Sequence, residues 1–243
     1  MAEPTREYVL VHGAAHGAWC WEDVAKRLEA KGSRVVALDL PGHGRRAAEA
    51  GRASVAAYAR AVADRMALEG VSRAILVGHS MGGVVIAKAA ELVPDRIAHL
   101  VFVAAVALPH GASVMEAHIG PSGRAAFLGL AAGSGGRTLV FPASMAKARW
   151  LGDLPASHPA IGRALAAITP QPLRPFLEPV DLRVFYTLSI PRTYIRCRRD
   201  AAVPPAKAAE YAARLGVTPI DLDSDHDPML SAPEELARLL DRV

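Results

Sequence analysis

Apolar and polar residues alternate along the chain in blocks that predict buried strands separated by helices. Each expected strand is a short apolar run, and each expected helix carries apolar residues three and four positions apart. In the first half of the chain, strands are expected at residues 8–11, 34–40, 74–77 and 99–106, and helices at 21–30, 54–68 and 84–92. Strands that are apolar on both faces indicate a parallel sheet covered by helices on both sides.

The pattern changes at Pro109 and returns near residue 190. The residues between, 109–189, are rich in glycine, proline, alanine and serine and contain no run that predicts a buried strand. Short helices are expected near residues 145–151, 159–168 and 173–177. The segment is too long for a loop, so we expect an inserted, mainly helical lid. We expect its glycine-rich pieces, 120–123 and 133–136, to be flexible connectors, because a phosphate-binding loop would need a preceding strand and a Lys-Ser/Thr pair.

Strand–helix alternation resumes after the insertion. Strands are expected at 193–197 and 217–222, and helices at 204–215 and 233–240, the last of them capped by Ser231. Because the insertion interrupts one sheet, we expect a single α/β domain over residues 1–243. Its core, 1–108 and 190–243, would hold six strands, with the lid at 109–189.

Composition narrows the class of protein. The chain has 243 residues, 51 % of them hydrophobic, and a formal charge of +4 without long basic blocks, so nucleic-acid binding is not expected. No apolar run reaches the roughly 18 residues that a membrane span needs. The polar N-terminal stretch, residues 1–7, lacks the apolar core of a signal peptide, and Cys20 and Cys197 fit buried free thiols. We expect a cytoplasmic protein with no membrane partner, and a homodimer is left open.

The motif Gly-His-Ser-Met-Gly at 78–82 follows the expected strand 74–77 and precedes the helix 84–92. A nucleophilic serine must project its hydroxyl from a turn too tight for side chains at the flanking positions, which Gly78 and Gly82 satisfy. The turn also places Ser80 at a helix N-terminus, where backbone N–H groups favour developing negative charge. We therefore interpret Ser80 as a catalytic nucleophile.

A serine nucleophile needs a base, and the base needs an acid that orients it. Asp200 follows the expected strand 193–197, and His226 follows the expected strand 217–222. The carboxyl ends of parallel strands meet at one edge of a sheet, so these side chains are expected to lie near Ser80. Other carboxylates remain candidates for the acid: Asp181, Asp221, Asp223, Asp225 and Asp227.

The developing oxyanion needs backbone N–H donors. We expect one from Met81, directly after the nucleophile, and one from Ala14, in the loop after the first strand. His12 and His16 are expected to hold that loop by hydrogen bonds. The candidate substrate contacts are His12, Gly13, Phe127, Met145 and Trp150, of which the last three either line a pocket or form the core of the lid. We expect no metal and no cofactor, because the chain has neither cysteine–histidine clusters with ligand spacing nor a dinucleotide-binding glycine motif after the first strand.

With these residues in place, the chain resembles the α/β-hydrolase superfamily along nearly its whole length. It is most similar to the methylesterase and hydroxynitrile lyase branch and its bacterial esterase relatives. The resemblance rests on Val-Leu-Val-His-Gly-Ala at 9–14, His-Gly-Ala-Trp at 16–19 with Trp21, Val-Ala-Leu-Asp-Leu at 36–40, Gly-His-Ser-Met-Gly-Gly at 78–83 and Ser-Asp-His at 224–226. It implies a sheet of six parallel strands in the order 2-1-3-4-5-6, a triad of Ser80, Asp200 and His226, and an oxyanion hole formed by Ala14 and Met81.

The lyases of this branch carry a threonine after the first-strand histidine and a lysine after the catalytic histidine. This chain has Gly13 and Asp227 at those positions. A carboxylate cannot supply the cation that receives cyanide, so lyase chemistry is not expected.

These observations lead to one hypothesis and its alternatives. We expect a cofactor-independent serine hydrolase that cleaves a small or medium methyl or aryl ester through an acyl-enzyme. The first alternative is a tailoring enzyme of secondary metabolism that uses the same triad for acyl transfer, cyclisation or ester hydrolysis with decarboxylation. A ligand-binding protein without turnover is the alternative from another class.

Overall fold

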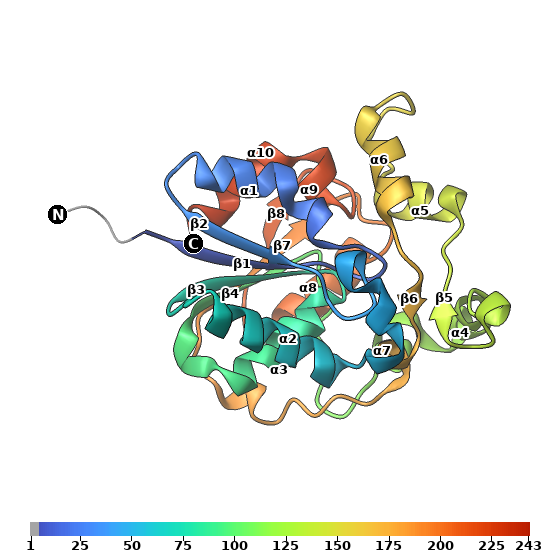
Figure 1. Ribbon diagram of the computed structural model, residues 1–243, viewed down its shortest axis with the longest axis horizontal. Helices are drawn as coiled ribbons and strands as arrows, with labels where there is room; N and C mark the ends of the chain where they lie inside the picture. Colours follow the sequence, from blue (N-terminus) through green and yellow to red (C-terminus); the bar gives the residue numbers. More distant parts are fainter. Residues whose placement is uncertain (1–4) are drawn as a thin grey trace.

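A six-stranded parallel sheet forms the centre of the molecule (Figure 1). The computed structural model describes residues 5–243. Residues 1–4 lie outside the described residues; they belong to the polar N-terminal stretch for which we expect no signal peptide. The strands lie in the order β2-β1-β3-β4-β7-β8, which confirms the predicted topology. Their bounds are β1 Glu7–Val11, β2 Arg34–Leu38, β3 Ala74–His79, β4 Ile97–Val103, β7 Arg192–Cys197 and β8 Ile220–Leu222.

Helices cover both faces of this sheet (Figure 1). On one face lie α1 (Glu22–Glu29) and α10 (Pro233–Leu240); on the other lie α2 (Val55–Leu68), α3 (Gly82–Leu92) and α8 (Pro205–Arg214). Short 3-10 helices span Ala18–Trp21, Gly44–Arg52, Pro94–Arg96, Ala132–Ser134 and Phe185–Thr187. No helix within residues 5–243 is long and apolar enough to cross a membrane.

The central strand β3 explains why the strand segments are apolar throughout. Leu76 packs into the core on the side of α2 and α3, whereas Ile75 and Val77 pack into the core on the side of α1 and α10. Successive side chains of a strand point to opposite faces. Because both faces are buried, residues 74–77 are all apolar, as the sequence pattern indicated.

Residues 109–189 lie mostly beyond the end of the sheet toward which the strands run (Figure 1). They form a π-helical turn at Met115–Ile119, α4 Gly120–Gly129, β5 Thr138–Leu139, α5 Ala143–Trp150, α6 Pro159–Ala167, β6 Gln171–Pro172 and α7 Arg174–Leu177. Helices α5, α6 and α7 match the three short helices expected there. β5 and β6 pair with each other in a two-residue antiparallel ladder, separate from the main sheet.

One of the two glycine-rich pieces, residues 120–123, is not the connector that composition suggested. Residues 120–123 form the first turn of α4, with Pro121 near its start, where proline is tolerated. Residues 133–136 form a tight turn in which Ser134 Oγ accepts hydrogen bonds from the N–H groups of Arg137 and Thr138, at 3.1 and 2.9 Å. Residues 133–136 thus connect α4 to β5 through a turn that these hydrogen bonds close.

The C-terminal region also differs from the expectation. A short helix, α9 (Pro228–Ser231), precedes α10, and the residue before α10 is Ala232, which makes no side-chain cap. Ser231 does not cap the last helix; its hydroxyl donates to Asp225 Oδ1 at 2.7 Å. The Ser231 hydroxyl, which the sequence pattern predicted as the cap of α10, is thus hydrogen-bonded to the Asp225 carboxylate instead.

Candidate active site

Ser80 occupies the sharp turn between β3 and α3. Its φ is +53°, a left-handed conformation that costs a non-glycine residue roughly 1–3 kcal/mol. The Ser80 N–H donates to the Val103 carbonyl at 3.1 Å, and the Ser80 carbonyl accepts from the N–H of Val106 at 2.9 Å. The neighbouring strand β4 and the residues after it thus hold the strained turn.

The two glycines of the motif are required by close backbone approach. A Cβ atom at Gly78 would lie 2.6 Å from the Gly82 carbonyl oxygen. A Cβ atom at Gly82 would lie 2.8 Å from the carbonyl oxygens of Val11 and His12. Side chains at either position would push α3 away from β1 and β3 and open the turn that carries Ser80.

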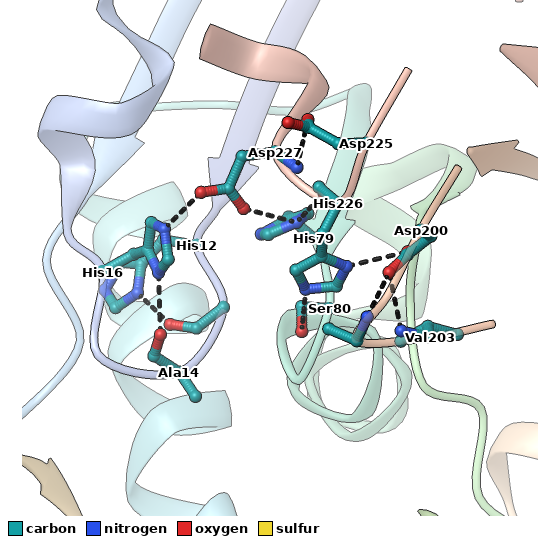
Figure 2. A network of polar contacts seen from close by, with 12 residues as sticks. His12, Ala14, His16, His79, Ser80, Asp200, Val203, Asp225, His226 and Asp227 are labelled. Atoms are coloured by element: carbon teal, nitrogen blue, oxygen red, sulfur yellow. Dashed lines mark hydrogen bonds and ion pairs between the residues drawn. The ribbon is translucent and has the colours of Figure 1, made fainter. Parts of the chain in front are cut away.

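The structure brings Ser80, His226 and Asp200 together (Figure 2). Nε2 of His226 lies 3.0 Å from Ser80 Oγ, and Nδ1 of His226 lies 2.8 Å from Asp200 Oδ2. The other carboxylate oxygen, Oδ1, accepts hydrogen bonds of 2.7 Å from the N–H groups of Ala202 and Val203. Asp200 is therefore fixed from both sides, and it is the carboxylate that contacts His226, whereas Asp181, Asp221, Asp223, Asp225 and Asp227 make other contacts.

The surroundings favour a protonated ring at His226. Burial of the ring lowers its pKa, but the nearby Asp200 carboxylate, which accepts its Nδ1–H, outweighs that effect. The pKa of His226 therefore lies above its ordinary value of 6.5. A base that binds a proton more tightly than free imidazole is suited to remove one from a hydroxyl.

The two expected oxyanion donors face no internal competitor. Within residues 5–243, no hydrogen bond engages the N–H of Ala14 or of Met81. Met81 is the residue before α3, where the first N–H groups of a helix lack partners in the helix. Ala14 lies in the loop after β1, whose residue Gly13 touches the turn that carries Ser80.

Three side chains hold the loop after β1. His12 donates from Nδ1 to the Gly13 carbonyl at 2.7 Å, and His16 donates from Nδ1 to the Ala14 carbonyl at 2.7 Å. The Ala15 N–H donates to Gln171 Oε1 at 2.9 Å. The hydrogen bonds expected of His12 and His16 are present. Since His12 is completely buried and its Nε2 accepts from the Leu40 N–H at 3.1 Å, its ring serves the loop rather than an open cleft.

A metal would find few free ligands among these residues. His12 and His16 are four positions apart, but both ring nitrogens of each are hydrogen-bonded to the protein. Ligand atoms of His79, His226 and Asp227 lie within 4.8 Å of one another. Both ring nitrogens of His226 already engage Ser80 and Asp200, and His79 Nε2 donates to the His226 carbonyl at 2.9 Å. The donor set therefore suits a hydrogen-bonded network rather than a metal centre.

The expected substrate contacts of the inserted segment separate into two groups. Phe127 and Met145 both line a cavity of about 540 Å³ beside Ala201 and Ala202, the residues that follow Asp200. Trp150 does not line it; its side chain is buried, with ring centroids 5.0 Å from those of His16 and Phe141. Trp150 therefore belongs to the apolar cluster between α5 and α6, not to the lining of this cavity.

Sequence reasoning missed two side chains of the inserted segment. His118 lines the same cavity, and its Nδ1 lies 3.0 Å from the Tyr211 hydroxyl; burial, then the charge of His226, lowers its pKa to about 4. Gln171 is completely buried, and its Oε1 accepts from both Ala15 N–H and His43 Nε2. Neither residue lies in a motif or at a predicted strand end, so the sequence carried no signal for them.

The comparisons with known proteins agree with this fold. The alpha/beta hydrolase family matches residues 8–239, so the chain belongs to this family. Methylesterase 7 of Arabidopsis thaliana is 30 % identical over 249 residues, covering 97 % of this chain and 95 % of that protein. Putative methylesterase 11, chloroplastic, of the same plant is 31 % identical over 252 residues; the match covers 97 % of this chain but only 63 % of that longer protein.

A solved structure gives the same picture. An extracellular alpha/beta-hydrolase from a Paenibacillus species, described as sharing structural and functional homology with tobacco salicylic acid binding protein 2, superposes with a TM-score of 0.89 at 28 % identity. The alignment covers 98 % of each chain. The similarity to methylesterases and bacterial hydrolases that the sequence motifs indicated is confirmed.

Proposed function

We propose that the protein is a cofactor-independent serine esterase that works through an acyl-enzyme. The observation that carries this proposal is the continuous chain of contacts from Ser80 Oγ through His226 to Asp200, at 3.0 and 2.8 Å. The chain belongs to a hydrolase family and is similar to methylesterases, and both facts support ester bonds as its target.

The reaction follows from the geometry. Ser80 Oγ attacks the ester carbonyl while His226 Nε2 takes the hydroxyl proton, and Asp200 stabilises the imidazolium that forms. The carbonyl oxygen becomes an oxyanion that accepts hydrogen bonds from the N–H groups of Ala14 and Met81. The tetrahedral intermediate then expels the alcohol, which takes the proton from His226. Water repeats the sequence on the acyl-enzyme and releases the acid.

The cavity beside the site supports a small or medium, partly apolar substrate. Its apolar lining includes Phe127, Phe141 and Met145, and its volume of about 540 Å³ lies in the range of small-molecule sites. A methyl or aryl ester would place its apolar part against these side chains while its carbonyl reaches Ser80.

The geometry does not favour lyase chemistry. A Cβ atom at Gly13 would lie 2.7 Å from the Ser80 Cβ, so the threonine of the lyases does not fit this loop without a shift. Asp227 is completely buried, and its Oδ2 lies 2.9 Å from His16 Nε2. The position thus holds an anion with its own partner.

Labelling with a fluorophosphonate probe tests the proposal. The wild type should be labelled, Ser80→Ala should not, and Ser33→Ala, a serine remote from the motif, should be labelled like the wild type. Labelling that persists in Ser80→Ala contradicts the proposal, and so does a folded wild type that binds esters but neither labels nor turns over. Product analysis with water and alcohol acceptors then separates hydrolysis from acyl transfer.

A further inference from the structure

A second buried histidine–aspartate pair lies beside the first (Figure 2). Nε2 of His16 and Oδ2 of Asp227 are 2.9 Å apart, and only 3 % and 1 % of the two side chains are exposed. Asp227 directly follows His226 in the chain, whereas His16 lies in the loop after β1. The esterase mechanism proposed above uses neither side chain.

The partners of His16 define its protonation. Nδ1 lies 2.7 Å from the Ala14 carbonyl oxygen and Nε2 lies 2.9 Å from the Asp227 carboxylate. A carbonyl oxygen and an ionised carboxylate only accept. Burial raises the pKa of Asp227, but His16 outweighs burial and lowers that pKa, which favours the ionised carboxylate. Both nitrogens must therefore carry hydrogen, which makes the ring an imidazolium. His12, in the same loop, differs because its Nε2 accepts from the Leu40 N–H, so its ring is neutral.

The charges around His16 agree with this assignment. Burial lowers the pKa of His16, but Asp227 outweighs it, and the pKa lies above its ordinary value. Three neighbouring histidines favour the neutral ring, because burial lowers the pKa of His12, His43 and His79, the last to about 3. His226, whose pKa is also raised, opposes the charge of His16, but Asp227 outweighs this effect as well. The nearby carboxylates of Asp39 and Asp225 accept backbone N–H groups, those of Ala18 and Asp227.

The hydrogen bond from His16 acts on the oxyanion loop. The Ala14 N–H belongs to the peptide unit whose carbonyl, that of Gly13, is held by His12. The next peptide unit begins with the Ala14 carbonyl, which His16 holds. Because peptide units are planar, fixing both carbonyls fixes both dihedral angles of Ala14 and the direction of its N–H. Ala15 follows with φ at +63°, so the loop is strained and depends on these contacts.

We propose that the imidazolium of His16, held by Asp227, is a positioning residue that fixes Ala14 in the oxyanion hole. This inference rests on the proposed esterase function, because it gives Ala14 its role. Its consequence is that stabilisation of the transition state depends on a buried proton that is separate from the one His226 transfers.

Two substitutions of His16 separate its two hydrogen bonds. Asparagine places an amide N–H near the position of Nδ1 and keeps the bond to the Ala14 carbonyl. Glutamine places its amide near Nε2 and keeps the bond to Asp227. His16→Gln should lower kcat by about 10²-fold with little change in KM, because an oxyanion contact is made mainly in the transition state. For His16→Asn, kcat should fall by less than about tenfold. Equal losses, or a larger loss in His16→Asn, would overturn the inference.

The pH profile gives a second, independent readout. In the wild type, kcat/KM should fall at alkaline pH as His16 loses its proton. Asp227→Asn removes the charge that holds the proton, so this alkaline limb should move to lower pH by roughly 1–3 units. An alkaline limb that stays in place in folded Asp227→Asn would also overturn the inference, since a merely structural pair would not move it.

Two controls separate the effect of His16 from general effects of replacing a histidine and from the proposed function itself. His99, on β4, is hydrogen-bonded to Thr193 Oγ1, on β7, at 2.9 Å. This pair lies outside the site, so His99→Asn and His99→Gln should retain the wild-type kcat. Fluorophosphonate labelling of the wild type reports on the proposed function by itself. If the wild type labels and hydrolyses esters while the His16 variants lose activity equally, only the positioning role fails.

Discussion

A Cβ atom added to Gly13 would lie 2.7 Å from the Cβ atom of Ser80, so the loop after β1 and the turn that carries Ser80 meet without room for a side chain between them. The same atom would lie 3.0 Å from His79 Nδ1. The relation couples the predicted oxyanion loop to the serine directly.

Gly13→Ala should therefore lower kcat/KM by on the order of 10²-fold, because the new methyl group displaces either the loop or the serine from its reactive position. Steady-state kinetics on a p-nitrophenyl ester measures the loss. Gly51→Ala is the matched control, since a Cβ atom there meets nothing within 4 Å. A Gly13→Ala variant as active as Gly51→Ala would show that the loop adapts without consequence.

Asp200→Asn should keep the fold but lower kcat by about 10⁴-fold, the loss known for an equivalent change in another serine hydrolase. The amide cannot hold the His226 tautomer that carries hydrogen on Nδ1. Asp223→Asn serves as the control, because that carboxylate is exposed and pairs with Arg199. Comparable kinetics for the two variants would remove Asp200 from the mechanism, and thermal melting verifies that both are folded.

The acidic limb of the pH profile should report on His226. The ring must be neutral to accept the Ser80 proton, so kcat/KM should rise with pH as His226 loses its proton, with an apparent pKa above 6.5. Asp200 contributes to that raised pKa, so Asp200→Asn should move the limb to lower pH. A limb at the same pH in both proteins would assign it to another group. Rates from about pH 5 to pH 9 cover the relevant range.

Phe127→Ala and Met145→Ala should each raise KM for an aryl ester by about tenfold, because both remove apolar surface from the cavity beside the site. The KM for a small ester, such as an acetate ester, should change little in both variants. Leu177→Ala is the control, since Leu177 is 41 % exposed and lies outside this cavity. The comparison uses p-nitrophenyl and methyl esters of graded size. Equal effects on large and small esters would place the substrate elsewhere.

Sequence reasoning succeeded where local pattern and sheet geometry suffice. The apolar run before Gly78 predicted a buried strand, and parallel strands end at one edge. This geometry was enough to expect Ser80, Asp200 and His226 near one another, although 146 positions separate the serine and the histidine. The strand order came from the family resemblance and was also correct.

The remaining features depend on contacts that no local pattern encodes. The sequence did not predict α4, because glycine disfavours helices and three glycines lie within residues 120–129. Asp227 looked like one of several acids in a polar turn, and its contact with His16 crosses 211 positions. Gln171 lies in the two-residue strand β6, which no apolar run predicted, and it reaches Ala15 across 156 positions. Such partners become visible only when the chain is folded.

Rapid-quench mass spectrometry during ester turnover tests the central claim most directly. The account predicts a peptide containing Ser80 that gains the mass of the acyl group, at a level that accumulates before steady state, and no such peptide in Ser80→Ala. Turnover by the wild type with an unmodified Ser80 peptide, or undiminished turnover by Ser80→Ala, would contradict it.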